Sequence, residues 1–128
     1  MNSSLMSIGG RLIGGDNPPY IVAEMSGNHG GELSRAVKIL EAAKDAGADA
    51  VKLQTYTADT ITIDHDGPEF KLEEGIWAGR SLYELYKDAS TPWEWHEKLF
   101  ARGREIGITV FSSPFDTTAI SLLNRLES

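Results

Sequence analysis

The sequence predicts a parallel α/β fold, because apolar segments of strand length alternate with segments of helical period along most of the chain. Residues 20–25, 48–55 and 108–113 have the composition of buried parallel strands. Segments with apolar residues at helical spacing follow each of them. Parallel strands are normally joined through such helices. The alternation alone leaves open whether the sheet is open or closed into a barrel.

Length and composition restrict the classes of protein that the chain can belong to. With 128 residues, of which 41% are hydrophobic and 24% charged, it has the balance of one globular domain. A net charge of -7 argues against nucleic acid and membrane surfaces as partners. The absence of cysteine excludes disulfides, thiolate metal ligands and cysteine nucleophiles. No secretory signal or membrane-spanning run is evident, so we expect a cytoplasmic protein.

The first half of the chain contains a hairpin, a strand, a helix and a second strand in this interpretation. Residues 1–19 carry two short apolar pairs around a Gly-Gly dipeptide, which predicts a small hairpin. After the strand at 20–25, a helix is expected from Ser34, as its N-cap, to Gly47, where it stops. With the next strand, this helix forms a right-handed crossover unit.

The second half begins with a connection that is unusually long for an α/β protein. Residues 56–79 show no sustained periodicity, and most α/β connections have about 2–6 residues. A short helix at 81–87 follows, and then a longer one from Thr91, as its N-cap, to Gly107, with a proline in its first turn. After the third strand, Asp116 caps a final helix.

Polar side chains occur late in each predicted strand. In open α/β sheets and in barrels, active sites form at the carboxyl ends of the strands. A lysine close to hydroxyl groups suits an anionic phosphate or carboxylate. The alternative is structural: an ion pair between neighbouring strands, and serines that belong to a turn. These residues are Glu24, Lys52, Gln54, Ser112 and Ser113.

Other candidate residues give weaker signals. Residues 28–31, Asn-His-Gly-Gly, could form an anion-binding loop, and His29 could be a general base, a metal ligand or simply a hydrogen-bonded side chain. His65 and His96 are expected on the solvated surface. Among the aromatic residues near the long connection, Trp77 is a possible substrate contact. Four acidic residues there lack calcium-loop spacing and are expected to be solvated: Asp59, Asp64, Asp66 and Glu69.

Four segments of the chain resemble the sialic acid synthase family, in the same order and with the same gaps. They read IVAEMSGNHGG, DAVKLQTYTADTITID, GRSLYELYKDASTPWEWH and GITVFSSPFD. The resemblance extends from about residue 10 to the last residue. The pairing of TYTADT with LYELYKDASTPWEWH favours the pseudaminic branch of the family over its N-acetylneuraminate and legionaminic branches.

The resemblance implies a (β/α)₈ TIM barrel of which this chain forms the N-terminal part, with about three β/α units. Residues 1–19 would be an N-terminal hairpin and residues 20–128 a partial barrel. The rest of the barrel and a C-terminal antifreeze-like domain are expected outside this chain. The family works as a domain-swapped dimer, so we expect a homo-oligomer.

The resemblance also implies a carbon–carbon bond-forming transferase. Phosphoenolpyruvate would condense with an amino-sugar aldehyde, here a 2,4-diacetamido-2,4,6-trideoxy hexose, to give pseudaminic acid and phosphate. A divalent metal, Mn²⁺ or Mg²⁺, would polarise the aldehyde, and its ligands are expected downstream of residue 128. This chain alone is therefore expected to be inactive. A non-catalytic oligomerising fragment that keeps only phosphate affinity is the alternative from another class.

Residue by residue, the resemblance assigns a catalytic role to Glu24. Its carboxylate would orient or deprotonate the water that captures the oxocarbenium ion, and would stabilise that cation. Lys52, Gln54 and Ser113 would bind phosphoenolpyruvate.

Two aromatic residues fall where family members meet the sugar, namely Trp77 and Tyr83. Sialic-acid relatives tend to carry a polar residue near the position of Trp77. An apolar ring there would suit a 6-deoxy sugar.

Overall fold

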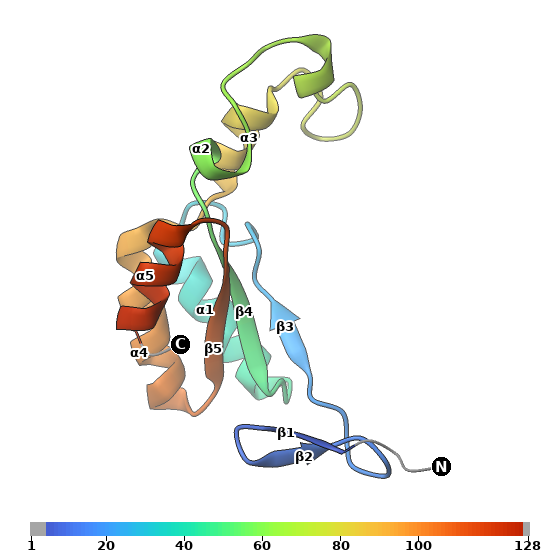
Figure 1. Ribbon diagram of the computed structural model, residues 1–128, viewed down its shortest axis with the longest axis vertical. Coiled ribbons are helices and arrows are strands. Elements are labelled where there is room, and N and C mark those ends of the chain that lie inside the picture. Colours follow the sequence, from blue (N-terminus) through green and yellow to red (C-terminus); the bar gives the residue numbers. More distant parts are fainter. Residues whose placement is uncertain (1–4, 127–128) are drawn as a thin grey trace.

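The computed structural model describes residues 5–126, in which a three-stranded parallel sheet stands between a hairpin at one end and an extended arm at the other (Figure 1). The sheet contains β3 (Val22–Glu24), β4 (Ala50–Thr55) and β5 (Thr109–Pro114) in this order. Each neighbouring pair is parallel, as expected from the crossover helices between them. The carboxyl ends of the strands point toward the arm (Figure 1).

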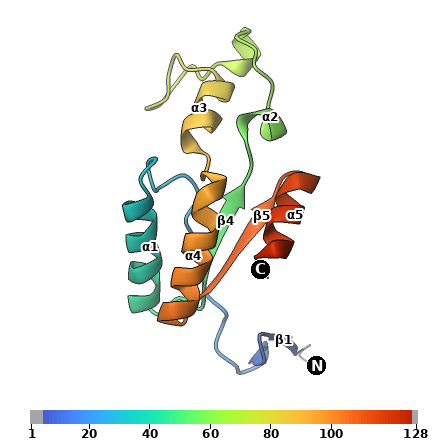
Figure 2. The same cartoon turned by 90° about the vertical axis from the view of Figure 1, so that its left-hand side faces the viewer.

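Two helices cover one face of the sheet. The helices α1 (Leu33–Asp45) and α4 (Trp93–Ile106) contact each other, and they pack on β4 and β5 respectively (Figure 2). The last helix, α5 (Thr117–Arg125), follows β5 and packs beside it. Within residues 5–126, the helices cover one face only and leave the opposite face of the strands uncovered.

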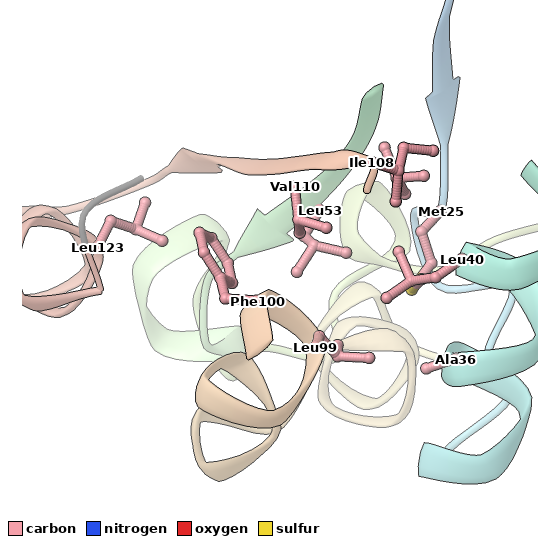
Figure 3. Packing of buried hydrophobic residues seen from close by; sticks show 10 residues of the cluster. Met25, Ala36, Leu40, Leu53, Leu99, Phe100, Ile108, Val110 and Leu123 are labelled. Carbon is pink, nitrogen blue, oxygen red and sulfur yellow. The ribbon is translucent and has the colours of Figure 1, made fainter. Parts of the chain in front are cut away.

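The hydrophobic core lies between the sheet and the two covering helices. Alternate strand residues Val51, Leu53 and Val110 point into it, where they meet Leu40 of α1 and Leu99 of α4 (Figure 3). Full burial of one leucine side chain contributes about 1.5–3 kcal/mol. The core therefore fixes which face of each strand points away from the helices.

The predicted hairpin is present at the amino ends of the strands. It consists of β1 (Met6–Ile8) and β2 (Arg11–Ile13), paired antiparallel. The two glycines between them have φ values of 57° and 82°, as a two-residue type I′ turn requires. The Arg11 guanidinium forms an ion pair with Asp49, just before β4, and thereby ties the hairpin to the sheet.

Two predicted helix starts are wrong. The helix α1 begins at Leu33 with Glu32 as its cap residue, so Ser34 is not the N-cap; the Glu32 carbonyl already accepts from Arg35 N–H. The cap residue of α4 is Pro92 and not Thr91. The Thr91 hydroxyl bonds to a histidine instead, and this tertiary contact overrides its local capping preference.

Other predicted helix ends are confirmed. Gly47 follows α1 in a left-handed conformation with φ 89°. Ser81, where a short helix was expected to start, caps α3 (Leu82–Ala89) in a capping box with Glu84. Asp116 accepts hydrogen bonds from two N–H groups at the start of α5.

The long connection is more regular than the sequence predicts. It contains the short helix α2 (Ala58–Ile61) and the 3₁₀ helix η1 (Pro68–Phe70) before it reaches α3 (Leu82–Ala89). These elements form the arm that rises from the carboxyl ends of the strands (Figures 1 and 2). Helices this short have no measurable period, so a pattern search does not find them.

Close packing of α4 on β5 leads to a first prediction. A Cβ atom on Gly103 would overlap Val110 Cγ2 and lie 3.0 Å from Ile108 O. We expect Gly103→Ala to lower the free energy of unfolding by about 1–3 kcal/mol, although alanine favours a helix by about 1 kcal/mol. Urea unfolding measures this. The double variant Gly103→Ala/Val110→Ala should lose less than the sum of the two single changes; strict additivity would contradict the proposed overlap.

Candidate active site at the carboxyl ends of the strands

Strand register places four of the predicted site residues on one face of the sheet. Glu24 of β3 is the Cα partner of Lys52 in β4, and Gln54 of β4 is the partner of Ser113 in β5. Partners in a parallel pair share a face, and residues two apart along a strand do so as well. All four side chains therefore lie on the face opposite to the core.

Glu24 and Lys52 form an ion pair. The distance from Lys52 Nζ to Glu24 Oε1 is 2.6 Å, so the ion pair considered as the structural alternative is present. The Glu24 side chain is 50% exposed and the Lys52 side chain 29%. An ion pair this accessible contributes little to stability, about 0–1 kcal/mol, so its fold-stabilising role is small. Both groups remain within reach of a ligand on the open face.

The two serines of β5 have separate environments. Ser113 lies on the open face, whereas Ser112 lies on the helix face, where its Oγ is 2.6 Å from Thr55 Oγ1. Thr55 Oγ1 is also 2.8 Å from His96 Nε2. The sequence suggested one role for both serines. Because successive side chains of a strand point to opposite faces, only the Ser113 hydroxyl faces the open side, and the Ser112 hydroxyl has a structural role.

The prediction of a solvated His96 is wrong. Its side chain is fully buried, with Nδ1 3.2 Å from Pro92 O and Nε2 bound to Thr55. Because a carbonyl only accepts, Nδ1 carries the hydrogen and Nε2 accepts from the threonine hydroxyl. Burial lowers the pKa of His96. The helical period contained the signal, since Leu99, Phe100 and Gly103 follow His96 at spacings of three, four and seven.

His29 is also fully buried, and hydrogen bonds occupy both of its ring nitrogens. Gly31 N–H donates to Nδ1 over 3.1 Å, so Nε2 carries the hydrogen and donates to Thr91 Oγ1 over 3.0 Å. The ring packs edge-on against Trp95, and burial lowers the pKa of His29. These contacts support the hydrogen-bonded interpretation over a general base or a metal ligand.

The loop around His29 does not present its backbone to an anion. Four of its N–H groups, those of Asn28, Gly30, Gly31 and Glu32, donate to acceptors within the same loop or at the end of β3. An anion loop needs free N–H groups. The anion-loop interpretation of residues 28–31 is therefore wrong.

His65 is exposed, as predicted, and Gly67 N–H donates to its Nδ1. The predicted acidic residues of the arm are solvated for the most part, and Asp59 accepts a hydrogen bond from Tyr83.

Among residues 5–126, no three His, Asp or Glu side chains are grouped so that they could hold a metal ion. Within the same residues, no helix is long and apolar enough to cross a membrane.

A cavity of about 610 Å³ opens between the loop after β3 and the arm. Of the predicted residues, Gln54 and Trp77 line it. Tyr83 is not part of the lining: its hydroxyl donates to Asp59 over 3.1 Å, and this hydrogen bond raises the pKa of Tyr83. Asn28, Gly30 and Gly31 also line it, although the sequence suggested an anion for their loop and not this cavity. The sequence did not single out the remaining lining residues, because only the fold brings them together: Gly27, Tyr56, Leu85, Tyr86, Asp88 and Ala89.

The cavity can hold a ligand with both polar and apolar surfaces. Trp77, Tyr56 and Tyr86 supply aromatic surface, and Gln54 and Asn28 supply amide groups that donate and accept. At its rim, Arg80 pairs with Asp88 and lies 5.7 Å from the Trp77 ring. Aromatic rings beside amides and a carboxylate are typical of sites that bind substituted sugars.

Comparison with known proteins yields a family match. The model of the NeuB family matches residues 39–128. A pseudaminic acid synthase of Campylobacter jejuni is 47% identical over 112 residues, which are 88% of this chain and 33% of that protein. An N,N'-diacetyllegionaminic acid synthase of Legionella pneumophila is 34% identical over 84% of this chain and 30% of its own length. The chain thus spans about a third of the length of these curated relatives.

A solved structure gives the same result for the fold. The N-acetylneuraminic acid synthetase of Leptospira borgpetersenii, in complex with citrate, superposes with a TM-score of 0.75 at 29% identity. The match covers 97% of this chain and 39% of that chain. The β/α units described above are therefore part of a TIM barrel, as predicted.

The two buried histidines lead to a prediction for the pH dependence of stability. Burial lowers the pKa of both side chains in the folded chain, where both are neutral. As the pH falls, the histidines of the unfolded chain therefore take up protons first, near the ordinary histidine pKa of about 6.5. The free energy of unfolding should therefore be flat above this pH and fall below it. Each histidine contributes at most about 1.4 kcal/mol per pH unit.

Urea unfolding between pH 7.5 and 5 measures this slope, and His96→Gln should make it shallower. His65→Gln, which removes an exposed imidazole by the same substitution, is the matched control. A slope unaffected by His96→Gln would show that this ring is accessible to protons in the folded chain.

Proposed function

We propose that this chain, which belongs to the NeuB family, is part of a synthase that condenses phosphoenolpyruvate with a 2,4-diacetamido-2,4,6-trideoxy hexose to form pseudaminic acid and phosphate. One observation carries the proposal. In a chain 47% identical to a pseudaminic acid synthase, Glu24 and Lys52 are paired on the open face of the sheet, and Gln54, two residues after Lys52 along β4, lines the cavity. The activity is that of a protein about three times as long as the matched segment.

In this proposal Lys52, Gln54 and Ser113 bind phosphoenolpyruvate. The Lys52 ammonium is a compact charge for a phosphate or carboxylate, and the other two side chains donate hydrogen bonds from the same face. Lys52 Nζ lies 2.6 Å from Glu24 Oε1, so a bound anion has to compete with the Glu24 carboxylate for the ammonium group. Binding therefore turns the ammonium from the carboxylate toward the ligand.

Glu24 is the catalytic residue in this proposal. Once Lys52 has turned to the ligand, the Glu24 carboxylate is free to accept a proton from the attacking water. It also stabilises the positive charge that develops on the substrate carbon that this water attacks. Its half-exposed position at the end of β3 leaves space for that water.

The cavity beside Gln54 is proposed to bind the amino sugar, with Trp77 against an apolar edge of the ring. Leu85 and Ala89 add apolar surface to the same cavity. A 6-deoxy sugar presents a methyl group where other hexoses present a hydroxymethyl group, and this suits such a wall. Tyr83, which the family resemblance also assigns to the sugar, does not line this cavity, and its hydroxyl donates to Asp59.

A divalent metal and a homo-oligomeric assembly also belong to the proposal, on the family resemblance. The residues described here do not fit a metal centre, because the buried histidines use both ring nitrogens in hydrogen bonds and no three His, Asp or Glu side chains among them are grouped to hold a metal ion. No step is therefore assigned to a metal ligand within this chain.

A second candidate is a legionaminic or N-acetylneuraminate synthase. Identity of 34% to a legionaminic acid synthase supports the same reaction class, but the 47% identity to a pseudaminic acid synthase favours the stereoisomer of the sugar that yields pseudaminic acid. A test replaces the matching third of the Campylobacter jejuni enzyme by this chain and offers the chimera phosphoenolpyruvate with each sugar. Mass spectrometry should detect product from the 2,4-diacetamido-2,4,6-trideoxy hexose. Turnover of N-acetylmannosamine in its place would refute the substrate assignment.

The ion pair leads to a prediction that separates binding from chemistry. Glu24→Gln should leave the affinity for phosphoenolpyruvate unchanged or stronger, because it removes a carboxylate that competes for Lys52. The same change should abolish product formation in the chimera. Calorimetry measures the affinity and mass spectrometry the product.

Lys52→Met should weaken phosphoenolpyruvate binding by at least about tenfold, since it removes a charge-assisted contact. The exposed Lys38 of α1 is the matched control, because Lys38→Met makes the same change in net charge away from the open face. Equal losses in the two lysine variants would mean that only the overall charge matters.

A further inference from the structure

The cavity has two walls that come from distant parts of the chain. One wall is the loop after β3, here called the glycine loop, with Gly27, Asn28, Gly30 and Gly31. The other is the last part of α3, with Leu85, Tyr86, Asp88 and Ala89. The separation of these walls decides what the cavity admits.

The walls touch at their base. A Cβ atom on Gly27 would lie 3.1 Å from both Ala89 Cβ and Ala89 O, so the loop approaches the end of α3 as closely as a glycine allows. At Gly31, by contrast, a Cβ atom would meet nothing within 4 Å. The loop is thus pressed against α3 at one glycine and opens into the cavity at another.

A buried hydrogen bond joins the two walls. His29 lies inside the loop, and its Nε2 donates over 3.0 Å to Oγ1 of Thr91, which follows the end of α3 by two residues. On the loop side, the same ring accepts Gly31 N–H at Nδ1. His29 is 0% exposed and Thr91 2% exposed, so water cannot replace either partner.

We propose that His29 and Thr91 are positioning residues, and that the hydrogen bond between them sets the width of the cavity by holding the glycine loop against the end of α3. The ring acts at both of its nitrogens: Nδ1 fixes the turn of the loop, and Nε2 fixes its distance from α3. The identity of the sugar that binds in the cavity rests on the proposed function. The hydrogen bond between the two walls does not depend on it.

Chain geometry explains why such a link is needed. The arm leaves β4 at Thr55 and returns at α4, so α3 is attached to the barrel through two connecting segments. The glycine loop has left-handed residues at Ser26, Gly30 and Gly31, with φ values of 48°, 59° and 76°. A non-glycine residue in this region is strained, and such strain persists only where surrounding contacts hold it. Within this loop, the His29 ring holds Gly31 by accepting its N–H at Nδ1.

Two substitutions at Thr91 test the link. Thr91→Val keeps the branched shape but removes the acceptor, which leaves the buried His29 N–H without a partner. Thr91→Ser keeps the hydroxyl and loses only a methyl group. Leu123→Ala in α5 is the control for general loss of stability, because Leu123 is buried in the core and takes no part in the cavity lining.

The first readout needs no ligand. Nuclear Overhauser contacts between the Gly27 Hα atoms and the Ala89 methyl group report the closest approach of the walls. We expect these contacts in the wild-type chain, in Thr91→Ser and in Leu123→Ala, and their loss in Thr91→Val. In the wild-type chain, ring ¹⁵N shifts should identify Nε2 as the protonated nitrogen of His29.

The second readout is the affinity for the 2,4-diacetamido-2,4,6-trideoxy hexose, measured by calorimetry. Thr91→Val should weaken binding by about tenfold or more, and Thr91→Ser by no more than about twofold. A purely structural role would make affinity follow stability, so that Leu123→Ala would also lose binding.

The outcomes separate this inference from the proposed function. Wall contacts that persist in Thr91→Val overturn the inference, whether or not the sugar binds. Loss of these contacts in Thr91→Val with no binding of the sugar by the wild-type chain upholds the link and overturns the sugar assignment. Loss of both contacts and affinity in Thr91→Val, with both retained in Thr91→Ser, supports the two together.

Discussion

In-register hydrogen bonding between β3, β4 and β5 is the constraint on which the rest of the structure depends. It aligns Glu24 with Lys52 and Gln54 with Ser113, and it sends their neighbours Leu53, Thr55 and Ser112 to the opposite face. A shift of one residue would bury the charged pair in the core and expose the leucine. The apolar contacts of α1 and α4 with the sheet therefore also secure the chemistry of the open face.

Much of the fold could be predicted from the sequence, because long elements carry a period. The three strands, α1 and α4 lie within a few residues of the predicted ranges, and the glycine turn of the hairpin was specific enough to place it. Predictions failed where a tertiary contact replaced a local preference. Thr91 resembles an N-cap in sequence, but its hydroxyl bonds to His29, which lies 62 residues away along the chain.

The candidate site was predictable in part for the same reason. Strand ends concentrate polar residues, so Glu24 and Lys52 could be named from their positions, and the structure pairs them. The cavity could not be found in this way, since its walls combine the loop after β3 with α3, and nothing in the sequence links the Asn-His-Gly-Gly segment of that loop to a helix more than 50 residues later. His96 was misassigned because a histidine between a tryptophan and a glutamate looks exposed until the residues three and four positions later are considered.

The buried chain from Ser112 through Thr55 to His96 has one direction only. Since Pro92 O can only accept, His96 must donate to it, Thr55 must donate to His96, and Ser112 must donate to Thr55. A second proton on His96 would make Nε2 a donor to Thr55 Oγ1, so the Thr55 hydrogen would have to turn away from the ring. The start of α4 and the ends of β4 and β5 thus share a single arrangement of hydrogens, and acidification perturbs all three together.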